Sequence, residues 1–258
     1  MSLVDGLINQ FQVLEALILR ETRAKFGAHA LGFLWAFIEP CFWIGTFWFL
    51  YAIAARKAPP GLDIIDFLAT GILTYLVFRQ TADNSVRAIS SNTRLLFYPQ
   101  VRPLDLVVAR SLLQIGTLGA VFVVLTGANA LYRQSLEIDS LMNVMVGFTL
   151  SWLLGASLGL AFCALSTFSN VVERLTSPLL RPAFWTSGLF FCAADLPYAV
   201  REALLWNPVL HCTETVRRGF FTNYDENYAD LSYVITCIVG LTLFGLTAER
   251  AARRRLEV

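Results

Sequence analysis

Long stretches without charged residues alternate with short polar segments along most of this chain. Six apolar runs can be followed, and with their flanking residues they predict six membrane-spanning helices, at about 31–55, 64–85, 108–132, 141–169, 179–195 and 230–248. A helix needs about 20 residues to cross the hydrocarbon core of a bilayer. The third, fourth and sixth runs reach that length directly, so we expect an all-α membrane protein.

The second and fifth runs are too short to cross as they stand. The second becomes polar at Arg79, and the fifth lies between Pro182 and Pro197. Proline lacks a backbone N–H and interrupts a helix. Irregular backbone is tolerated at membrane depth only where protein or water surrounds it. We therefore expect the fifth span to be broken or re-entrant.

The segments outside these runs also contain helical patterns. Within residues 1–30, apolar residues recur every three or four positions, at Leu7, Ile8, Phe11, Leu14, Leu17 and Ile18. This period predicts an amphipathic helix that lies on the membrane surface or packs against another subunit. Residues 195–230 are too polar to span and too apolar to lie free in water. They predict one or two short helices at the outer interface, broken near Pro208.

Basic residues are divided unevenly between the two sides of the predicted membrane. The N-terminal segment, the links after the second and fourth spans, and the basic tail at 249–258 hold 14 Lys and Arg residues together. The opposite side holds the other 6. The positive-inside rule then places both termini in the cytoplasm, with an even number of crossings.

Composition supports a membrane location and argues against several functions. Hydrophobic residues make up 56% of the 258-residue chain and charged residues 15%, against about 25% charged in soluble domains. The net charge of +1 gives no basic field for nucleic acid. The sequence has no Gly-x-x-x-x-Gly-Lys-Ser/Thr loop, so we expect no ATPase activity in this chain. Its two histidines, His29 and His211, lie far apart, and we expect neither a metal nor a bound cofactor.

Three stretches and one glycine carry a resemblance to a known family. The first is Arg20-Glu-Thr-Arg-Ala-Lys-Phe-Gly-Ala-His-Ala-Leu-Gly-Phe-Leu-Trp-Ala-Phe-Ile-Glu-Pro40. The second is Asn92-x-x-Leu-Leu-x-x-Pro-x-Val-x-Pro-Leu-Asp-x-x-x-Ala-Arg110, and the third is Asn207-Pro-Val-Leu-His-x-x-Glu-x-x-Arg217. With Gly71, these stretches resemble the capsular polysaccharide export permeases of the ABC-2 type, in order from about Arg20 to the end of the sixth span.

This resemblance implies a function and a set of partners. It implies a homodimer in the bacterial inner membrane that works with two separate ATPase subunits, which bind ATP and Mg²⁺. The implied substrate is a lipid-linked polysaccharide, and a periplasmic polysaccharide co-polymerase and an outer-membrane export protein are implied as further partners. An exporter of O-antigen, teichoic acid or a small drug is the alternative within transporters. An intramembrane glycolipid enzyme is the alternative outside them, with Asp63 and Asp66 as the closely spaced acid pair at a membrane edge.

The link between the second and third spans is the candidate for coupling to the ATPase. Its prolines fix φ and bar helix continuation, which predicts a stiff turn. Apolar residues beside the turn suit a partner surface, although a simple solvated loop is the alternative. The candidate coupling residues are Asn92, Leu95, Leu96, Phe97, Pro99, Val101, Pro103, Asp105 and Arg110. The amphipathic helix over 11–26 is expected to dock against the ATPase together with this link.

An aromatic stripe in the first span is the candidate translocation pathway. Its members are Trp35, Glu39, Trp43, Phe47 and Tyr51, at four-residue intervals. Aromatic rings can stack on the apolar faces of sugars and still let them slide. The alternative is aromatics that face lipid or a second subunit. A carboxylate at mid-bilayer costs on the order of 3 kcal/mol, so Glu39 should face the bundle, water or a partner, or be protonated.

Two sets of charged residues complete the candidates. Arg174 and Arg181 could receive the phosphate of a lipid-linked substrate, since arginine binds phosphate with two hydrogen bonds, but positive-inside placement explains them equally well. On the outer side, a gate or partner contact could form from His211, Glu214, Arg217 and Arg218. The alternative for this second set is a solvated helix with pairs three and four residues apart.

Overall fold

The computed structural model describes residues 3–27, 31–54, 62–98, 100–134, 138–222, 224 and 228–256. Its elements in order are α1 (Leu3–Phe26), α2 (Leu31–Ile53), α3 (Ile64–Val86), the 3-10 helix η1 (Ser90–Phe97), α4 (Pro103–Arg133), α5 (Leu141–Ser166), α6 (Asn170–Thr186), the 3-10 helix η2 (Ala193–Asp195), α7 (Tyr198–Leu204), α8 (Pro208–Phe220) and α9 (Leu231–Leu256). The described residues contain no strand, which confirms the prediction of an all-α protein.

Four helices of the described chain are long and apolar enough to cross a membrane. They are α2, α4, α5 and α9. The predicted second span corresponds to α3, which is 23 residues long but carries several polar side chains in its second half. The predicted fifth span overlaps α6, which has 17 residues with Pro178 and Pro182 inside it. Helix α3 is therefore long enough but too polar to be counted among these four helices, and α6 is too short.

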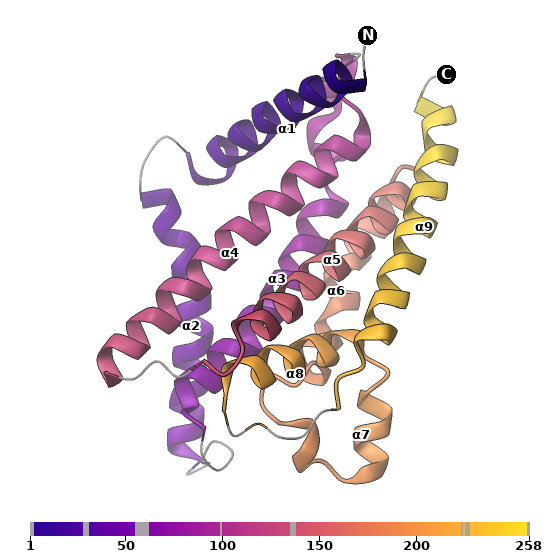
Figure 1. The fold of residues 1–258 in the computed structure, drawn as a ribbon. Coiled ribbons are helices and arrows are strands. Elements are labelled where there is room, and N and C mark those ends of the chain that lie inside the picture. Colours follow the sequence, from indigo (N-terminus) through magenta and orange to yellow (C-terminus); the bar gives the residue numbers. More distant parts are fainter. Residues whose placement is uncertain are drawn as a thin grey trace.

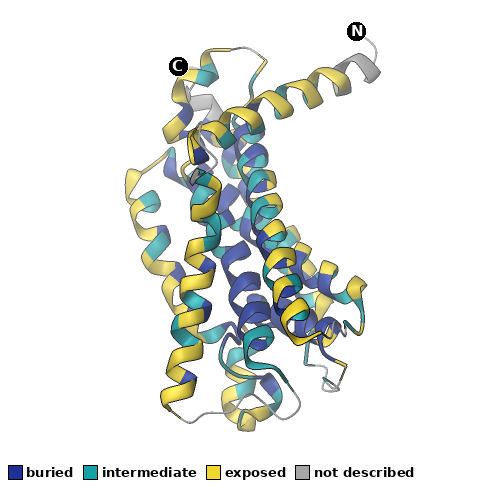
Figure 2. Ribbon diagram, turned by 90° about the vertical axis from the view of Figure 1, so that its left-hand side faces the viewer, coloured by how far each residue is buried: buried dark blue, intermediate teal, exposed yellow. Residues whose placement is uncertain are grey.

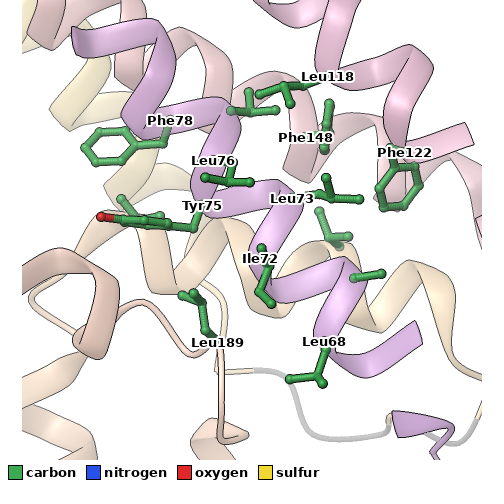
Figure 3. Close-up of a cluster of buried hydrophobic side chains, with 14 of the residues drawn as sticks. Leu68, Ile72, Leu73, Tyr75, Leu76, Phe78, Leu118, Phe122, Phe148 and Leu189 are labelled. Carbon is green, nitrogen blue, oxygen red and sulfur yellow. The ribbon is translucent and has the colours of Figure 1, made fainter. Parts of the chain in front are cut away.

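Helix α3 lies at the centre of the bundle. Figure 2 shows buried residues along the middle of the molecule and exposed residues along its outer helices. In Figure 3 the α3 residues Leu68, Ile72, Leu73 and Leu76 lie among side chains from α4, from α5 and from the segment after α6. All four are fully buried or nearly so. Polar residues of α3 can therefore cross inside protein rather than against lipid.

Two glycines of α5 allow this close packing on α3. A Cβ on Gly155 would lie 2.4 Å from the carbonyl oxygen of Phe78, and one on Gly159 would lie 2.5 Å from the Cβ of Ser85. Small residues at such contacts let two membrane helices approach closely. The short distance also lets the hydroxyl of Ser151 donate to the carbonyl of Thr74 at 2.7 Å.

Both termini lie at the same end of the bundle, and α1 lies across that end (Figure 1). The helix buries Leu17 against a small apolar cluster that includes Ile89, Leu106 and Leu160. These residues come from the α3 to η1 link, α4 and α5. The amphipathic helix predicted within 1–30 thus packs on its own bundle with one side and leaves residues such as Phe11 exposed on the other.

The chain turns back after α6, at the end opposite to the termini (Figure 1). Helix α6 ends at Thr186, and Gly188 adopts a φ of 75°, which favours glycine. The predicted break near Pro208 is the start of α8, where the side chain of Asn207 accepts from the N–H of Val209 at 3.0 Å. The segment between α6 and α8 thus contains only the short elements η2 and α7.

Residues 195–230 contain two short helices, α7 and α8, with the break near Pro208 as predicted, and α8 lies inside the protein. Of its 13 residues, 11 are buried, and the helix packs against α3 and α5. Gly147 of α5 permits the contact, since a Cβ there would lie 2.7 Å from Cγ2 of Val216. Polarity suggested a surface position, but the polar side chains of α8 instead satisfy groups inside the protein. By contrast, α7 has no buried residue.

Candidate functional site

Arg110 of α4 joins three other elements at the end where the termini lie. Its guanidinium donates to the carboxylate of Glu21 in α1, with Nε to Oε2 at 3.1 Å. It also donates to the hydroxyl of Ser91 in η1 at 2.7 Å and to the carbonyl oxygen of Asn84 in α3 at 3.1 Å. One side chain therefore ties α1, α3, η1 and α4 together through charge-assisted hydrogen bonds.

Asn92 and Asp105 strengthen the same connection. The amide of Asn92 donates to Oε1 of Glu21 at 2.8 Å, and its Oδ1 accepts from Arg20 at 2.6 Å. Asp105 accepts from the side-chain amide of Gln10 in α1, and it caps α4 by accepting from the backbone N–H of Arg102 at 2.9 Å. Both Asn92 and Asp105 are buried. We call the group formed by Glu21, Asn92, Asp105 and Arg110 the polar joint.

The structure divides the predicted coupling residues into two groups. Asn92, Asp105 and Arg110 belong to the polar joint, and Leu95, Leu96 and Val101 pack partly buried on the apolar cluster beneath α1. Pro103 is the first residue of α4, and Pro99 lies outside the described residues. Phe97 remains 86% exposed, and Tyr98 beside it is exposed as well. Of the described coupling residues, Phe97 is thus the large apolar one that is available to a partner.

The predicted aromatic stripe of α2 does not lie on one face. A helix has 3.6 residues per turn, so each four-residue interval rotates by about 40°, and Trp35 and Tyr51 lie about 160° apart. Trp43 and Phe47 pack on Phe184 of α6, with ring centroids at 5.3 and 5.8 Å. The hydroxyl of Tyr51 donates to the carbonyl oxygen of Phe190 at 2.8 Å. Trp43, Phe47 and Tyr51 therefore make internal contacts with α6 and the turn after it.

Trp35 and Glu39 face a different region, between α1, α3 and α4. Glu39 is exposed, and its Oε2 accepts from the side-chain amide of Gln80 at 3.1 Å. Gln80 in turn accepts from Gln114, which also accepts from the ammonium of Lys25 at 2.7 Å. We call Lys25, Gln114, Gln80 and Glu39 the amide relay. The two glutamines were not among the predicted site residues, although a glutamine within an apolar helix is a signal of a polar contact that the sequence shows.

Arg174 and Arg181 are both exposed on α6. They lie two turns apart in the helix, with Pro178 exposed between them. The structure therefore leaves both guanidinium groups accessible on one helix, on either side of a proline.

Arg217 is fully buried in α8 and holds the broken segment in place. Its guanidinium donates to the carbonyl oxygens of Phe191 at 2.8 Å and Leu189 at 3.1 Å. It lies over the ring of Phe67 at 3.9 Å, and Gly71 makes room for it, since a Cβ there would lie 2.8 Å from an arginine nitrogen. Gly71, a feature of the resemblance, thus has a structural explanation in the position of this side chain.

Glu214 and His211 are also internal. Glu214 lies 3.9 Å from Arg217 and accepts from the hydroxyl of Tyr224 at 2.7 Å. The Nδ1 atom of His211 accepts from the backbone N–H of Asp230 at 2.9 Å, and its Nε2 lies 2.8 Å from the carbonyl oxygen of Leu205. Arg218 alone of the four predicted gate residues is exposed. His211, Glu214 and Arg217 thus satisfy groups in the interior, and the predicted role as a gate or partner contact remains a prediction.

These arrangements can be compared with those of known proteins. A family model described as ABC-2 type transporter matches residues 12–221, which is most of the chain. The chain belongs to the ABC-2 type transporter family. The match runs from α1 through α8, so it includes the polar joint, the amide relay and the buried arginine. Membership in this family confirms the resemblance found in the sequence.

Individual relatives of this ABC-2 transporter chain are similar over nearly their whole lengths. It is 30% identical to the capsule polysaccharide export inner-membrane protein CtrC of Neisseria meningitidis serogroup B, covering 94% of this chain and 91% of that protein. It is 28% identical to the polysialic acid transport protein KpsM of Escherichia coli, covering 95% and 97%. The O-antigen export system permease protein RfbA of Klebsiella pneumoniae is 21% identical, with 94% of each chain covered.

The buried arginine generates a stability prediction. Arg217→Met leaves the Glu214 carboxylate buried without its cation, and removing one partner of a buried pair costs about 3–5 kcal/mol. We expect a clear fall in the thermal unfolding midpoint of the purified protein in detergent. The double variant with Glu214→Gln should recover part of the loss, because the unpaired charge is gone. Arg218→Met is the matched control, and equal midpoints for the two single variants would contradict the assignment.

Proposed function

We propose that this chain is the membrane permease of an ATP-driven exporter that moves lipid-linked capsular polysaccharide across the bacterial inner membrane. The observation that carries this proposal is the similarity to capsule export proteins over more than nine-tenths of both chains. The ATP and Mg²⁺ are bound by a separate ATPase subunit, present in two copies. Export of O-antigen is the second candidate, and the lower identity to the O-antigen permease makes it the weaker one.

The permease crosses the membrane six times, through α2, α3, α4, α5, α6 with its returning segment, and α9. The four apolar helices support four of these crossings. The burial of α3 supports a fifth, since its polar residues are shielded by protein. The excess of basic residues on the side of the termini supports a cytoplasmic location for both of them.

Two copies of the chain form the conduit together. Helix α2 supports this arrangement, because it is the least enclosed of the apolar helices and exposes Phe33, Phe42, Trp48 and Phe49. Such large side chains suit lipid on one side and a second subunit on another. A periplasmic polysaccharide co-polymerase and an outer-membrane export protein receive the polymer, and Arg218 is the exposed residue of α8 that could contact such a partner. Arg174 and Arg181 on α6 receive the lipid phosphate.

The polar joint couples the ATPase to the spans. A partner that pushes on Phe97 moves η1, and the bonds of Arg110 pass this movement to α1, α3 and α4 together. Part-buried charge-assisted bonds suit such a role, because they are directional and stronger than hydrogen bonds between neutral groups.

Deletion of the gene tests the function. We expect cells without this chain to stop displaying capsule and to accumulate lipid-linked polymer in the cytoplasm, measured by extraction and glycan analysis. Normal capsule, with no accumulated polymer, would exclude the proposal. Accumulation of lipid-linked O-antigen in place of capsule would favour the second candidate.

The coupling surface generates a separate prediction. Phe97→Asp should reduce co-purification of the ATPase and abolish export while the chain still reaches the membrane, because an exposed apolar contact is replaced by a charge. Tyr132→Asp is the matched control, since Tyr132 is equally exposed, at 86%, at the other end of α4. Retention of the ATPase by Phe97→Asp at the level of the control would show that this surface is not the docking site.

A further inference from the structure

The imidazole of His211 joins three elements at the end of the bundle opposite to the termini (Figure 1). His211 belongs to α8 and is 4% exposed. Its Nδ1 atom accepts from the backbone N–H of Asp230, the residue before α9, at 2.9 Å. Its Nε2 atom lies 2.8 Å from the carbonyl oxygen of Leu205, the residue after α7. We call Leu205, His211 and Asp230 the histidine latch.

The two partners of the imidazole determine its protonation state. A ring nitrogen that accepts from an N–H cannot carry a proton itself, so Nδ1 is unprotonated. In a neutral imidazole the other nitrogen then carries the proton. Nε2–H therefore donates to the carbonyl oxygen of Leu205. The hydrogen-bond partners thus assign His211 as a neutral ring with its proton on Nε2.

Protonation would change the two bonds of the latch in opposite ways. An imidazolium is a donor at both nitrogens. A proton on Nδ1 would point at the N–H of Asp230, so the bond to the start of α9 is lost. The bond from Nε2–H to Leu205 remains, and a charged donor strengthens it. Histidine is the side-chain type that commonly changes charge between pH 5 and 8. A proton taken up by His211 therefore releases the start of α9 and leaves α7 attached to α8.

The charged groups of α8 and α9 near His211 each have another partner. Glu214 interacts electrostatically with His211, but it also lies 3.9 Å from Arg217 and accepts from the hydroxyl of Tyr224 at 2.7 Å. The carboxylate of Asp230 accepts from two backbone N–H groups in the first turn of α9, at 2.9 and 3.1 Å. Glu214 is therefore the carboxylate that attracts an imidazolium at this position.

The other elements around α8 place their charges elsewhere. Helix α5 contains no charged residue between Leu141 and Ser166. In α3, the carboxylate at the same end is that of Asp66, which lies 3.8 Å from Arg133 of α4. In α7, Arg201 donates to the hydroxyl of Tyr228 at 3.0 Å. The bond between His211 and Asp230 thus responds mainly to the proton on the imidazole itself.

Further bonds limit the change to the start of α9. Helix α7 buries no residue of its own. It is held to the α9 side by the bond from Arg201 to Tyr228, and the hydroxyl of Tyr233 in α9 donates to the carbonyl oxygen of Trp206 at 2.8 Å. Neither bond involves the imidazole nitrogens. Loss of the Asp230 bond therefore loosens the first turn of α9 without detaching α7.

We propose that His211 is a proton-operated latch at the outer end of the permease. The neutral ring fixes the start of α9 to α8, and uptake of a proton from the outer side releases it. The assignment of this end to the outer side rests on the proposed function. The latch goes beyond that function, because it makes the outer end of the chain respond to the acidity outside the membrane.

Nitrogen-15 NMR of the histidine ring tests the latch directly. The chain has two histidines, so histidine labelling of the full-length His29→Gln chain in lipid nanodiscs leaves the signals of His211 alone. Near pH 8 we expect an unprotonated Nδ1 and a protonated Nε2, and near pH 5 a second spectrum with both nitrogens protonated. The opposite tautomer near pH 8, or a ring that stays neutral near pH 5, would overturn the proposal.

Two substitutions separate the two bonds. His211→Asn keeps an acceptor for Asp230 that does not titrate, whereas His211→Gln keeps a donor for Leu205 and loses that acceptor. Hydrogen exchange of the Asp230 amide, corrected for its intrinsic rate at each pH, is the measurement. In the wild type, protection should fall about fivefold on acidification, the effect of losing one hydrogen bond. His211→Asn should stay protected near pH 8 and near pH 5, and His211→Gln should be unprotected at both.

The outcomes separate the latch from the proposed function. An equal loss of protection in the wild type and in His211→Asn would show that another group responds to acid, and it would overturn the proposal. Wild-type protection of Asp230 in His211→Gln would overturn it as well. These measurements need neither substrate nor ATPase, so their failure leaves the proposed function in place. Undisturbed capsule export after deletion of the gene contradicts the proposed function and not the latch.

Discussion

The structure depends on one constraint, which is that polar groups at membrane depth must be satisfied by the protein itself. Hydrocarbon offers no hydrogen bonds, and an unpaired polar group there costs several kcal/mol. Helix α3 meets the constraint by lying in the middle of the bundle, where the carbonyl of Thr74 accepts from Ser151. The broken segment after α6 meets it through Arg217, which donates to the carbonyl oxygens of Leu189 and Phe191 in this non-helical segment. A central polar helix and a buried arginine are two solutions of the same problem.

Hydrogen bonds between polar side chains also join the helices at the end of the bundle near the termini. Glu21 accepts from both Arg110 and Asn92, and these bonds cross from α1 to α4 and η1. Such bonds are strong when partly shielded from water, so the three elements should move together. The amide relay lies next to the polar joint and ends at Glu39. Asn84 joins the two groups, because its carbonyl oxygen accepts from Arg110 and its side-chain amide donates to Gln114.

How much of this could be predicted from the sequence differs from element to element. Apolar runs predict α2, α4, α5 and α9, because length and hydropathy alone decide a crossing. The burial of α8 was not predicted, because polar residues such as Glu214 look the same in the sequence whether they face water or a buried arginine 3.9 Å away. The predicted stripe on α2 does not form one face, because positions four residues apart rotate around a helix by about 40° per step. The amide relay needs side chains from four helices, and no local pattern brings Lys25 beside Gln114.

The central claim is that α3 crosses the membrane in spite of its polarity, and cysteine labelling tests it most directly. Ile53, which is 67% exposed, and Phe97 lie beyond opposite ends of α3. Each is replaced by cysteine in turn, in a Cys41→Ala background that removes the exposed native thiol. Spheroplasts are treated with a membrane-impermeant maleimide. We predict labelling at position 53 in intact spheroplasts and at position 97 only after they are permeabilised. Labelling of both positions from the same side would contradict the account.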